Sequence, residues 1–305
     1  MPRPRRLDFK GAIHLVRMAG REGLKIYFDV NKLAALVEPV RAVAQVRVFE
    51  KIITVACEEC GAVLHAYCIE SNTCSLLVEV CGLPLQALMQ RVRAQYSRYL
   101  LCDGLLAKGA RPYAARYESK IIAPAYLAHA VRRVHGSAKG LAAFSSAAAY
   151  AGGRAMVPLE TEPVREALAQ RGYAGVRGYQ TFMMQADSEF VTQLFERGSP
   201  LDSRIVGDRA FVIWAREAAA HPPVLPSREH LIATVASIIE RKPEELFEST
   251  RVGALGRALV AWYAMRSGAA TLTETGKWFS VGAATLGRGI RHFRQVRPEL
   301  FRRVL

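Results

Sequence analysis

The residues with the clearest chemical potential lie on a segment of helical periodicity near the C-terminus, from residue 283 toward residue 295. One face of this segment is apolar, and the opposite face carries Thr285, Arg288, Arg291 and His292. Hydroxyl, guanidinium and imidazole groups donate hydrogen bonds to guanine edges and to phosphates. No acidic side chain accompanies them, so the pattern predicts a DNA-contacting helix.

The segment just before this helix supports the same prediction. Residues 271–279 form a second short helical segment, and Ser280, Val281 and Gly282 form a turn between the two. Two short helices joined by a tight, glycine-containing turn are typical of a helix-turn-helix. Within that motif the apolar residues expected to pack on the preceding helices are Leu286, Ile290 and Phe293. We also assign Lys277 and Arg294 to the DNA-binding surface.

Two glycines weaken this interpretation. Gly287 and Gly289 lie inside the proposed recognition helix, where each glycine costs about 1 kcal/mol of helix propensity relative to alanine. They would instead permit a close approach to the DNA backbone. The alternative is a helical bundle whose basic face is simply solvated.

The overall charge favours a polyanionic partner. The chain of 305 residues carries a formal net charge of +15, and six arginines face a single acid, Glu299, between Arg288 and Arg303. Such an excess of positive charge is typical of nucleic-acid binding. The sequence has no uninterrupted apolar run of 18 residues and no apolar core behind its first residues, so we expect a cytoplasmic, nucleoid-associated protein without a membrane partner.

A metal site formed by cysteines is less well supported by the sequence than DNA binding. All six cysteines lie between residues 57 and 102, and Cys57 and Cys60 have the spacing of a zinc knuckle. A structural zinc site needs a second pair of ligands, and no second pair follows at a matching spacing. We therefore expect neither a metal nor another cofactor.

The elements that position these residues alternate in the first half of the chain. Residues 12–16, 62–69 and 75–80 are apolar and β-rich, which predicts strands, whereas residues 46–55 and 83–101 have helical spacing. The second helix has an apolar face with Leu85, Leu88, Met89, Val92, Tyr96 and Leu100. This order of elements predicts an α+β fold.

Composition changes divide the chain into three parts. The segment LAAFSSAAAYAGG (141–153) is poor in large apolar residues, and HPPVLP (221–226) cannot continue a helix. We expect a first domain over residues 1–150, a helical connector over 151–226 and an all-helical DNA-binding domain over 227–305. Ser227 is expected to cap the first helix of the last domain.

Several motifs in the first domain resemble one family. The opening PRPRRLDFKGA (2–12), the strand pair HAYCIESNTCSLLVE (65–79), the helix end QYSRY (95–99), RYES (116–119) and the segment from Ala125 through Gly140 follow in the family's order. Over about residues 1–150 the chain is similar to the REP-associated tyrosine transposases, relatives of the single-strand transposases with the HUH fold. Members with a C-terminal extension resembling the DNA-binding domain of the DnaA initiator match residues 227–305.

The resemblance implies a ferredoxin-like, HUH-type antiparallel sheet with helices. It also implies two metal-binding histidines and a nucleophilic tyrosine, but those positions hold Thr73, Ser75 and Arg133. Hydroxyl groups are weak ligands for a transition-type metal, and arginine stays protonated. The chain is therefore expected to be a catalytically inactive relative with no catalytic residues.

The same comparison suggests which other residues matter. A groove for a hairpin or single strand is expected to be lined by Arg91, Arg93, Arg98, Arg116, Arg132 and Arg133. Substitute catalytic groups in reach of such a site would be His65, His129, His135 or Tyr126. The histidines are expected to be packed or surface residues, and the family keeps a tyrosine at position 126 beside its catalytic one.

These observations lead to one preferred function and two alternatives. We expect a domesticated, transposase-like protein that binds duplex DNA and acts as a transcriptional regulator or DNA-element-binding factor. One alternative is an active, metal-dependent single-strand endonuclease with substitute residues. The other makes the first domain a dimerisation or protein-interaction scaffold, so a monomer and a homodimer both stay open.

Overall fold

The computed structural model describes residues 6–22, 24–28, 39–114, 116–136, 144–221 and 225–301. The chain divides into two compact units: the first contains most residues through Pro222, and the second consists of Pro223–Leu305 together with the short segments Glu59–Gly61 and Gly82–Pro84. The expected motif residues 2–5 and 137–140, part of each predicted boundary segment (141–143 and 222–224) and the last arginines, 302 and 303, lie outside the described residues.

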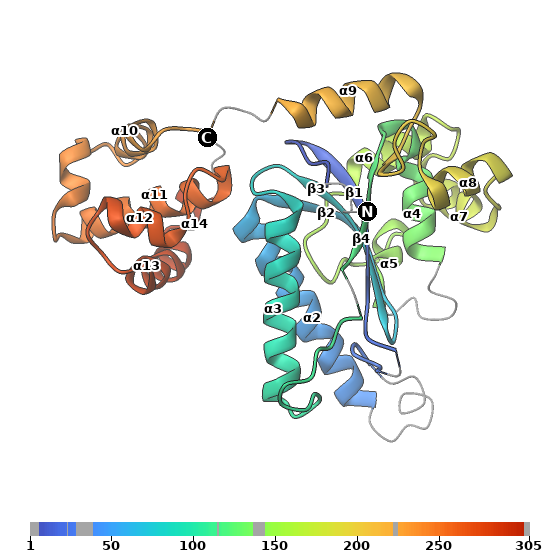
Figure 1. The fold of residues 1–305 in the computed structure, drawn as a ribbon, viewed down its shortest axis with the longest axis horizontal. Helices are drawn as coiled ribbons and strands as arrows, with labels where there is room; N and C mark the ends of the chain where they lie inside the picture. The colour runs from blue at the N-terminus through green and yellow to red at the C-terminus, as the bar shows by residue number, and fades with distance from the viewer. Residues whose placement is uncertain are drawn as a thin grey trace, which may run out of the picture. The chain divides into compact units, whose positions relative to one another are not determined.

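The first unit is built on a five-stranded sheet of order β2-β3-β1-β4-β5 (Figure 1). Its strands are β1 (Ala12–Ala19), β2 (Ala62–Ile69), β3 (Thr73–Val80), β4 (Glu118–Ile122) and β5 (Ile205–Val206). The pairs among β1 to β4 are antiparallel, and β5 adds to β4 in parallel. The predicted α+β class is confirmed, with a mixed sheet.

Helices cover both faces of this sheet (Figure 1). One face packs against α2 (Pro39–Cys60) and α3 (Leu85–Cys102), and all six predicted apolar positions of α3 are buried. Tyr67 of β2 points to this face, because its hydroxyl donates a hydrogen bond of 2.6 Å to Glu50 of α2. Since side chains alternate along a strand, Ala66 and Cys68 point to the opposite face, where they join the core formed with α4 (Leu127–Gly136).

The segment expected to be a helical connector belongs to this second layer. It contains α6 (Glu162–Ala169), α7 (Gly175–Met184), α8 (Glu189–Arg197) and α9 (Arg209–Ala220), and it also supplies β5. Val164, Leu168 and Val206 are almost fully buried in one apolar cluster with Leu77 of β3 and Val131 of α4. Two short elements, η1 (Pro124–Tyr126) and α5 (Ala147–Tyr150), flank α4 in sequence.

Between residues 225 and 301, which the structure describes, the regular elements of the second unit are all helices. Its elements are α10 (Arg228–Ile238), η3 (Pro243–Phe247), α11 (Arg251–Ser267), α12 (Leu272–Trp278), α13 (Ala283–Val296) and α14 (Pro298–Phe301). The Ser227 side chain accepts a hydrogen bond from the His230 backbone N–H at 3.1 Å, which confirms the predicted cap of α10.

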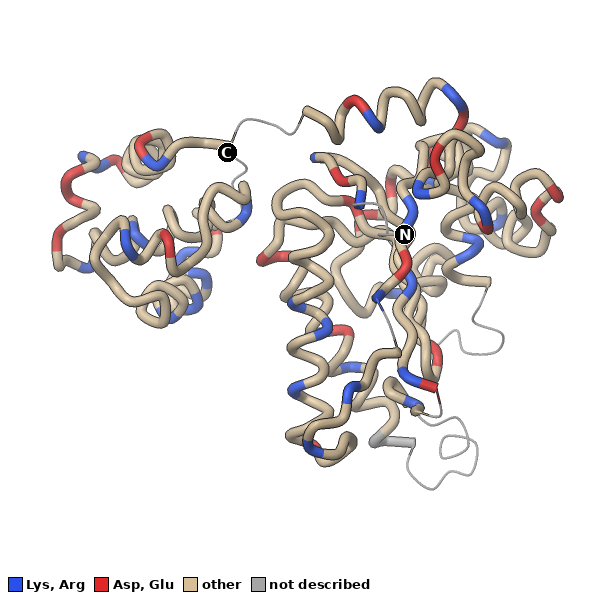
Figure 2. Tube along the Cα trace, viewed as in Figure 1, with Lys and Arg blue, Asp and Glu red and all other residues tan. Residues whose placement is uncertain are grey.

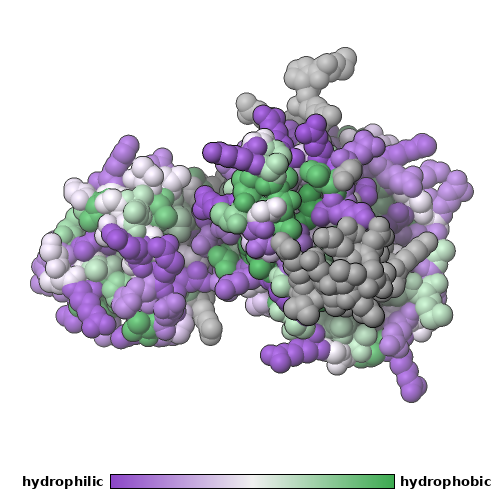
Figure 3. Space-filling model, turned by 90° about the horizontal axis from the view of Figure 1, so that it is seen from below, coloured by the Kyte–Doolittle hydropathy of each residue, from purple (hydrophilic) through white to green (hydrophobic). Residues whose placement is uncertain are grey.

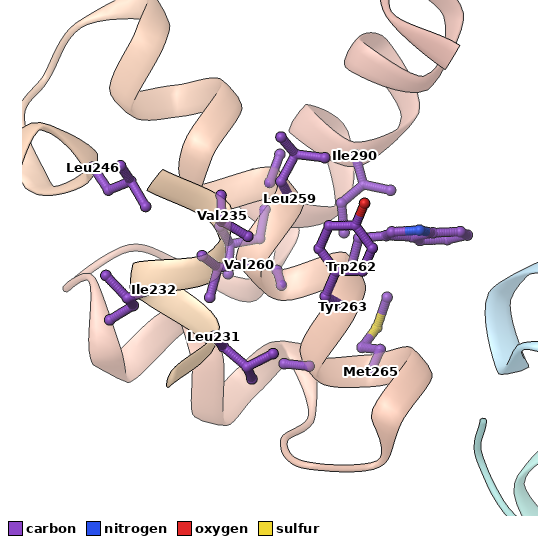
Figure 4. Close-up of a cluster of buried hydrophobic side chains, with 14 of the residues drawn as sticks. Leu231, Ile232, Val235, Leu246, Leu259, Val260, Trp262, Tyr263, Met265 and Ile290 are labelled. Carbon is purple, nitrogen blue, oxygen red and sulfur yellow. The ribbon is translucent and has the colours of Figure 1, made fainter. Parts of the chain in front are cut away.

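The core of this unit forms around α11. Leu231 and Val235 of α10 converge on Leu259 and Trp262 of α11, and Ile290 of α13 closes the cluster (Figure 4). Each fully buried aliphatic side chain of this kind contributes about 1.5–3 kcal/mol through removal from water. In the described part of the chain, no helix has the length and apolar composition needed to cross a bilayer.

A buried polar network links three helices of the first unit. His135 at the end of α4 contacts the Ser146 hydroxyl (2.7 Å) with Nε2 and the Tyr179 hydroxyl (2.8 Å) with Nδ1. Ser146 in turn accepts a hydrogen bond from the Tyr67 backbone N–H at 2.8 Å. Burial lowers the pKa of His135 to about 3. The imidazole is therefore neutral in the folded protein at physiological pH.

This network predicts an acid sensitivity of the first unit. In the unfolded chain a histidine takes up a proton near pH 6.5, whereas folded His135 does so only near pH 3. The unfolded state therefore binds the extra proton between these values, and stability falls as the pH is lowered through this window. In guanidinium unfolding followed by circular dichroism between pH 6 and 4, His135→Gln should lose about 1.4 kcal/mol less per pH unit than the parent protein. Equal slopes in the two proteins would contradict a neutral, buried His135.

Candidate nucleic-acid interface

The first half of the candidate interface is α12, whose start is fixed by a reciprocal cap. The Thr271 hydroxyl accepts a hydrogen bond from the Glu274 backbone N–H at 3.2 Å, and the Glu274 carboxylate accepts one from the Thr271 backbone N–H at 2.7 Å. Such a capping box satisfies two backbone donors that the helix itself leaves unpaired. The capping box thus fixes Thr271 as the N-cap of α12, the helix that precedes the turn.

The turn between α12 and α13 packs closely against the end of α12. Ser280 adopts a positive φ of 54°, and the Val281 backbone N–H donates to the Gly276 carbonyl at 2.9 Å. A β-carbon at residue 276 would lie 2.5 Å from the Val281 carbonyl oxygen, so no side chain fits there without a shift of the turn. Glycine at this position lets the chain fold back directly onto α12 and begin α13 at Ala283.

The apolar face of α13 anchors it to the rest of the unit. The three predicted packing residues, Leu286, Ile290 and Phe293, are buried, which confirms that prediction. A β-carbon at Gly289 would lie 3.5 Å from the Ala258 side chain of α11, an ordinary van der Waals distance. Gly289 therefore lies on the helix side that faces α11.

The outward face of α13 carries the predicted contact residues. Thr285, Arg288, Arg291 and His292 are all exposed, and Lys277 is exposed on α12. Figure 2 shows α13 as a run of basic positions, and hydrophilic residues predominate on the side of this unit seen in Figure 3. Arg294 differs from these five exposed residues, because its guanidinium carbon lies 4.5 Å above the Trp262 ring and the side chain is partly buried. Arg294 therefore also supports the core.

A groove of about 300 Å³ runs beside this face, between α11 and α13. It is lined by Ala254, Arg257, Val281, Thr285, Leu286, Arg288, Gly289 and His292. Arg257 was not predicted as a site residue. Its guanidinium donates to the carbonyls of Leu246 (2.7 Å) and Glu248 (2.6 Å), and burial lowers its pKa. The sequence gives no signal for it, since its place beside α13 depends on how α11 packs.

In the first unit, the two positions where the sequence resemblance implies histidines, Thr73 and Ser75, share a face of β3. Thr73 and Ser75 point to the α4 side of the sheet, and both are partly buried. The Thr73 hydroxyl donates to the Glu70 carboxylate. Ser75 pairs with Arg17 of β1, which places an exposed guanidinium on the same face. Within the described residues, no group of three or more His, Cys, Asp or Glu side chains is arranged to hold a metal ion.

Arg133, where the sequence resemblance implies a tyrosine, lies in an ion-pair cluster on α4. Its Nε donates to Asp187 Oδ2 at 3.1 Å, and Arg132 Nη1 and His129 Nδ1 contact Asp187 Oδ1 at 2.8 and 2.7 Å. Only 7% of the Asp187 side chain is exposed. Arg132 also lies 3.7 Å above the Phe182 ring. One buried carboxylate thus neutralises part of the positive charge that we expected to face a nucleic acid.

The six arginines expected to line one groove are divided between two layers. Arg91, Arg93 and Arg98 lie on α3, on one side of the sheet, whereas Arg132 and Arg133 lie on α4, on the other side. Arg116 lies two residues before β4. A shared groove for all six is therefore incorrect, because the β-sheet separates the two helices.

The histidines and the tyrosine considered as substitute catalytic groups also have separate environments. His65 contacts the Glu160 carbonyl (2.7 Å) and the Glu79 carboxylate (3.3 Å), while His135 belongs to the buried network with Ser146. Tyr126 is partly buried, with its ring centroid 6.3 Å from that of His129. The structure does not bring these groups together at Thr73 and Ser75.

The close turn predicts a large effect of one methyl group. Gly276→Ala should destabilise the second unit by about 1–3 kcal/mol, because the added β-carbon forces the turn apart. Gly287→Ala provides a matched control, since a β-carbon there would meet no atom closer than 3.8 Å. This control should be neutral or stabilising by up to about 1 kcal/mol. Guanidinium unfolding followed by tryptophan fluorescence measures both changes, and equal effects of the two substitutions would refute the steric account.

The comparisons with known proteins provide no relative for this arrangement. No protein-family model, no curated protein and no solved structure matches the chain.

Proposed function

We propose that this protein binds duplex DNA through α12, the following turn and α13, and that it serves as a transcriptional regulator or a DNA-element-binding factor. The observation that carries the proposal is the division of α13 into two faces. Leu286, Ile290 and Phe293 fix the helix on the unit, and the opposite face presents polar and basic side chains to solvent. A helix held in this way can enter a major groove while its outer residues contact base edges and phosphates.

The positions on α13 suggest how the contacts are divided. Thr285 and Arg288 lie in the first half of the helix, and Arg288 Nη2 is 3.5 Å from the Thr285 hydroxyl. In helix-turn-helix complexes the N-terminal part of the recognition helix reads base edges, so these two residues are assigned to base contacts. Arg291 and His292 lie one turn later and are assigned to phosphates. Lys277 adds a positive charge on α12.

The proposal also holds that the first unit does not cleave DNA. Thr73 and Ser75 offer hydroxyl groups where the family resemblance implies imidazoles, and Arg133 is ion-paired with Asp187 where it implies a tyrosine. Neither hydroxyl is a strong ligand for a transition-type metal, and a guanidinium cannot attack phosphorus. The protein would therefore bind DNA, in the nucleoid, without forming a covalent intermediate.

The duplex-binding part predicts a specific dependence on two arginines. Arg288→Ala combined with Arg291→Ala should lower affinity for a random-sequence duplex by at least about tenfold at 100 mM salt. If both side chains contact phosphates in this non-specific mode, the slope of log K against log salt should fall by about 1.8. Fluorescence anisotropy measures both quantities.

Arg241→Ala is the matched control, because Arg241 is exposed on the same unit but lies 3.9 Å from Glu245, beside the acidic η3 segment. The affinity of the Arg241→Ala variant for the duplex should change by less than about twofold. Unchanged duplex binding in the double variant would exclude α13 as the contact surface.

The absence of cleavage is tested with hairpin single strands in magnesium or manganese. We expect neither a nick nor a protein–DNA adduct on denaturing gels, because no tyrosine occupies position 133 and no imidazole occupies position 73 or 75. A covalent adduct would refute this part of the proposal and favour an active enzyme with substitute residues.

A further inference from the structure

The groove between α11 and α13 has one wall that the proposed duplex contacts do not use. Its volume is about 300 Å³, and α13 lines it with Thr285, Arg288, Gly289 and His292. Thr285, Arg288 and His292 also belong to the exposed face assigned to DNA, so the groove continues that face. The opposite wall comes from α11 and carries Arg257.

The Arg257 guanidinium is held in place through one of its nitrogen atoms. Nη1 donates to the Leu246 carbonyl at 2.7 Å and to the Glu248 carbonyl at 2.6 Å, at the end of η3. An arginine has further donors on Nε and Nη2, and within the described part of the chain neither atom has a hydrogen-bond partner. The guanidinium is therefore oriented before a ligand binds, and it keeps donors for that ligand.

The charges around the groove favour an anion. No Asp or Glu is among its lining residues, and Arg257 forms no ion pair with any described residue. Arg257 and Arg288 thus bring two positive charges to the two walls of the groove. Because Arg257 is partly buried, water screens its attraction for an anion less than it would at an exposed arginine.

The remaining lining residues are small or apolar. Ala254 lies one turn before Arg257 on α11, and Gly289 lies on the opposite wall, so neither fills the groove. Val281 and Leu286 add apolar surface. Cationic donors beside apolar surface suit a nucleic-acid strand, in which charged phosphates alternate with sugar rings.

We propose that this groove receives a phosphate of the DNA backbone and that Arg257 binds it. Guanidinium groups bind phosphate oxygens through paired, charge-assisted hydrogen bonds. This assignment rests on the proposed duplex binding through α13, and it adds a contact from a second helix. Phosphate contacts fix the orientation of a protein on the duplex, so Arg257 would set the angle at which α13 enters the major groove.

The first test removes the charge of Arg257 in the full chain. Arg257→Gln should lower affinity for a random-sequence duplex by about tenfold at 100 mM salt. Since one phosphate contact is lost, the slope of log K against log salt should fall by about 0.9. Fluorescence anisotropy at several salt concentrations measures both quantities, and circular dichroism at the assay temperature checks that the variant is folded.

The second test keeps every charge and narrows the groove. Ala254→Leu places a larger side chain one turn from Arg257, and both residue types are strong helix formers. A phosphate would then reach Arg257 only after a shift of the wall, so duplex affinity should fall by about fivefold or more. This variant leaves the two carbonyl contacts of Arg257 untouched, so it separates the phosphate contact from the structural role of that side chain.

Arg241→Gln is the matched control, because it removes one charge from an exposed arginine of the same unit, 3.9 Å from Glu245. It should change duplex affinity by less than about twofold. An equal loss of affinity in Arg257→Gln and Arg241→Gln would overturn the proposal, since only net charge would then matter. An unchanged salt slope in Arg257→Gln, or full affinity in Ala254→Leu, would overturn it as well.

Failure of the proposed function gives a different result. If the unchanged chain binds no duplex, duplex binding and the Arg257 contact are both refuted. If the chain binds the duplex and loses affinity in the Arg288→Ala, Arg291→Ala variant but not in Arg257→Gln, only the Arg257 contact is refuted.

Discussion

The close packing of the turn at Gly276 is the constraint on which the candidate interface depends. Because the Val281 carbonyl occupies the space that a side chain would need, α13 begins immediately after the turn, and its position relative to α12 is fixed by backbone contacts. Leu286 and Ile290 are then buried in the core that forms around α11. The outward direction of Thr285 and Arg288 follows from these two conditions, since residues on one helix rotate together.

In the first unit, the residues that pack the sheet are different from the residues considered for chemistry. Its sheet keeps apolar side chains on both faces, and helices cover both, so the framework is well packed. On that framework Thr73 and Ser75 are ordinary strand residues, and Arg133 contributes to an ion-pair cluster around Asp187. Arg133 is paired with a carboxylate that is itself almost fully buried, so its contacts within the protein are structural.

Local patterns were sufficient to predict much of this structure. The buried face of α3, the cap at Ser227 and the packing residues of α13 all follow from helical periodicity and capping chemistry, which depend on residues close in sequence. Strand β5 has only two residues, so it has no periodicity to detect. The pairing of Arg133 with Asp187 joins positions 54 residues apart, and the hydrogen bond from Arg6 to the Tyr117 carbonyl joins positions 111 residues apart. Only the fold determines such contacts.

Hydrogen–deuterium exchange of the full chain, with and without duplex DNA, tests the central claim most directly. If α13 is the contact helix, the amides of Ala283–Val296 should exchange more slowly when the duplex is present, and those of α10 should change little. Protection elsewhere on the chain with unchanged exchange in α13 would contradict the account.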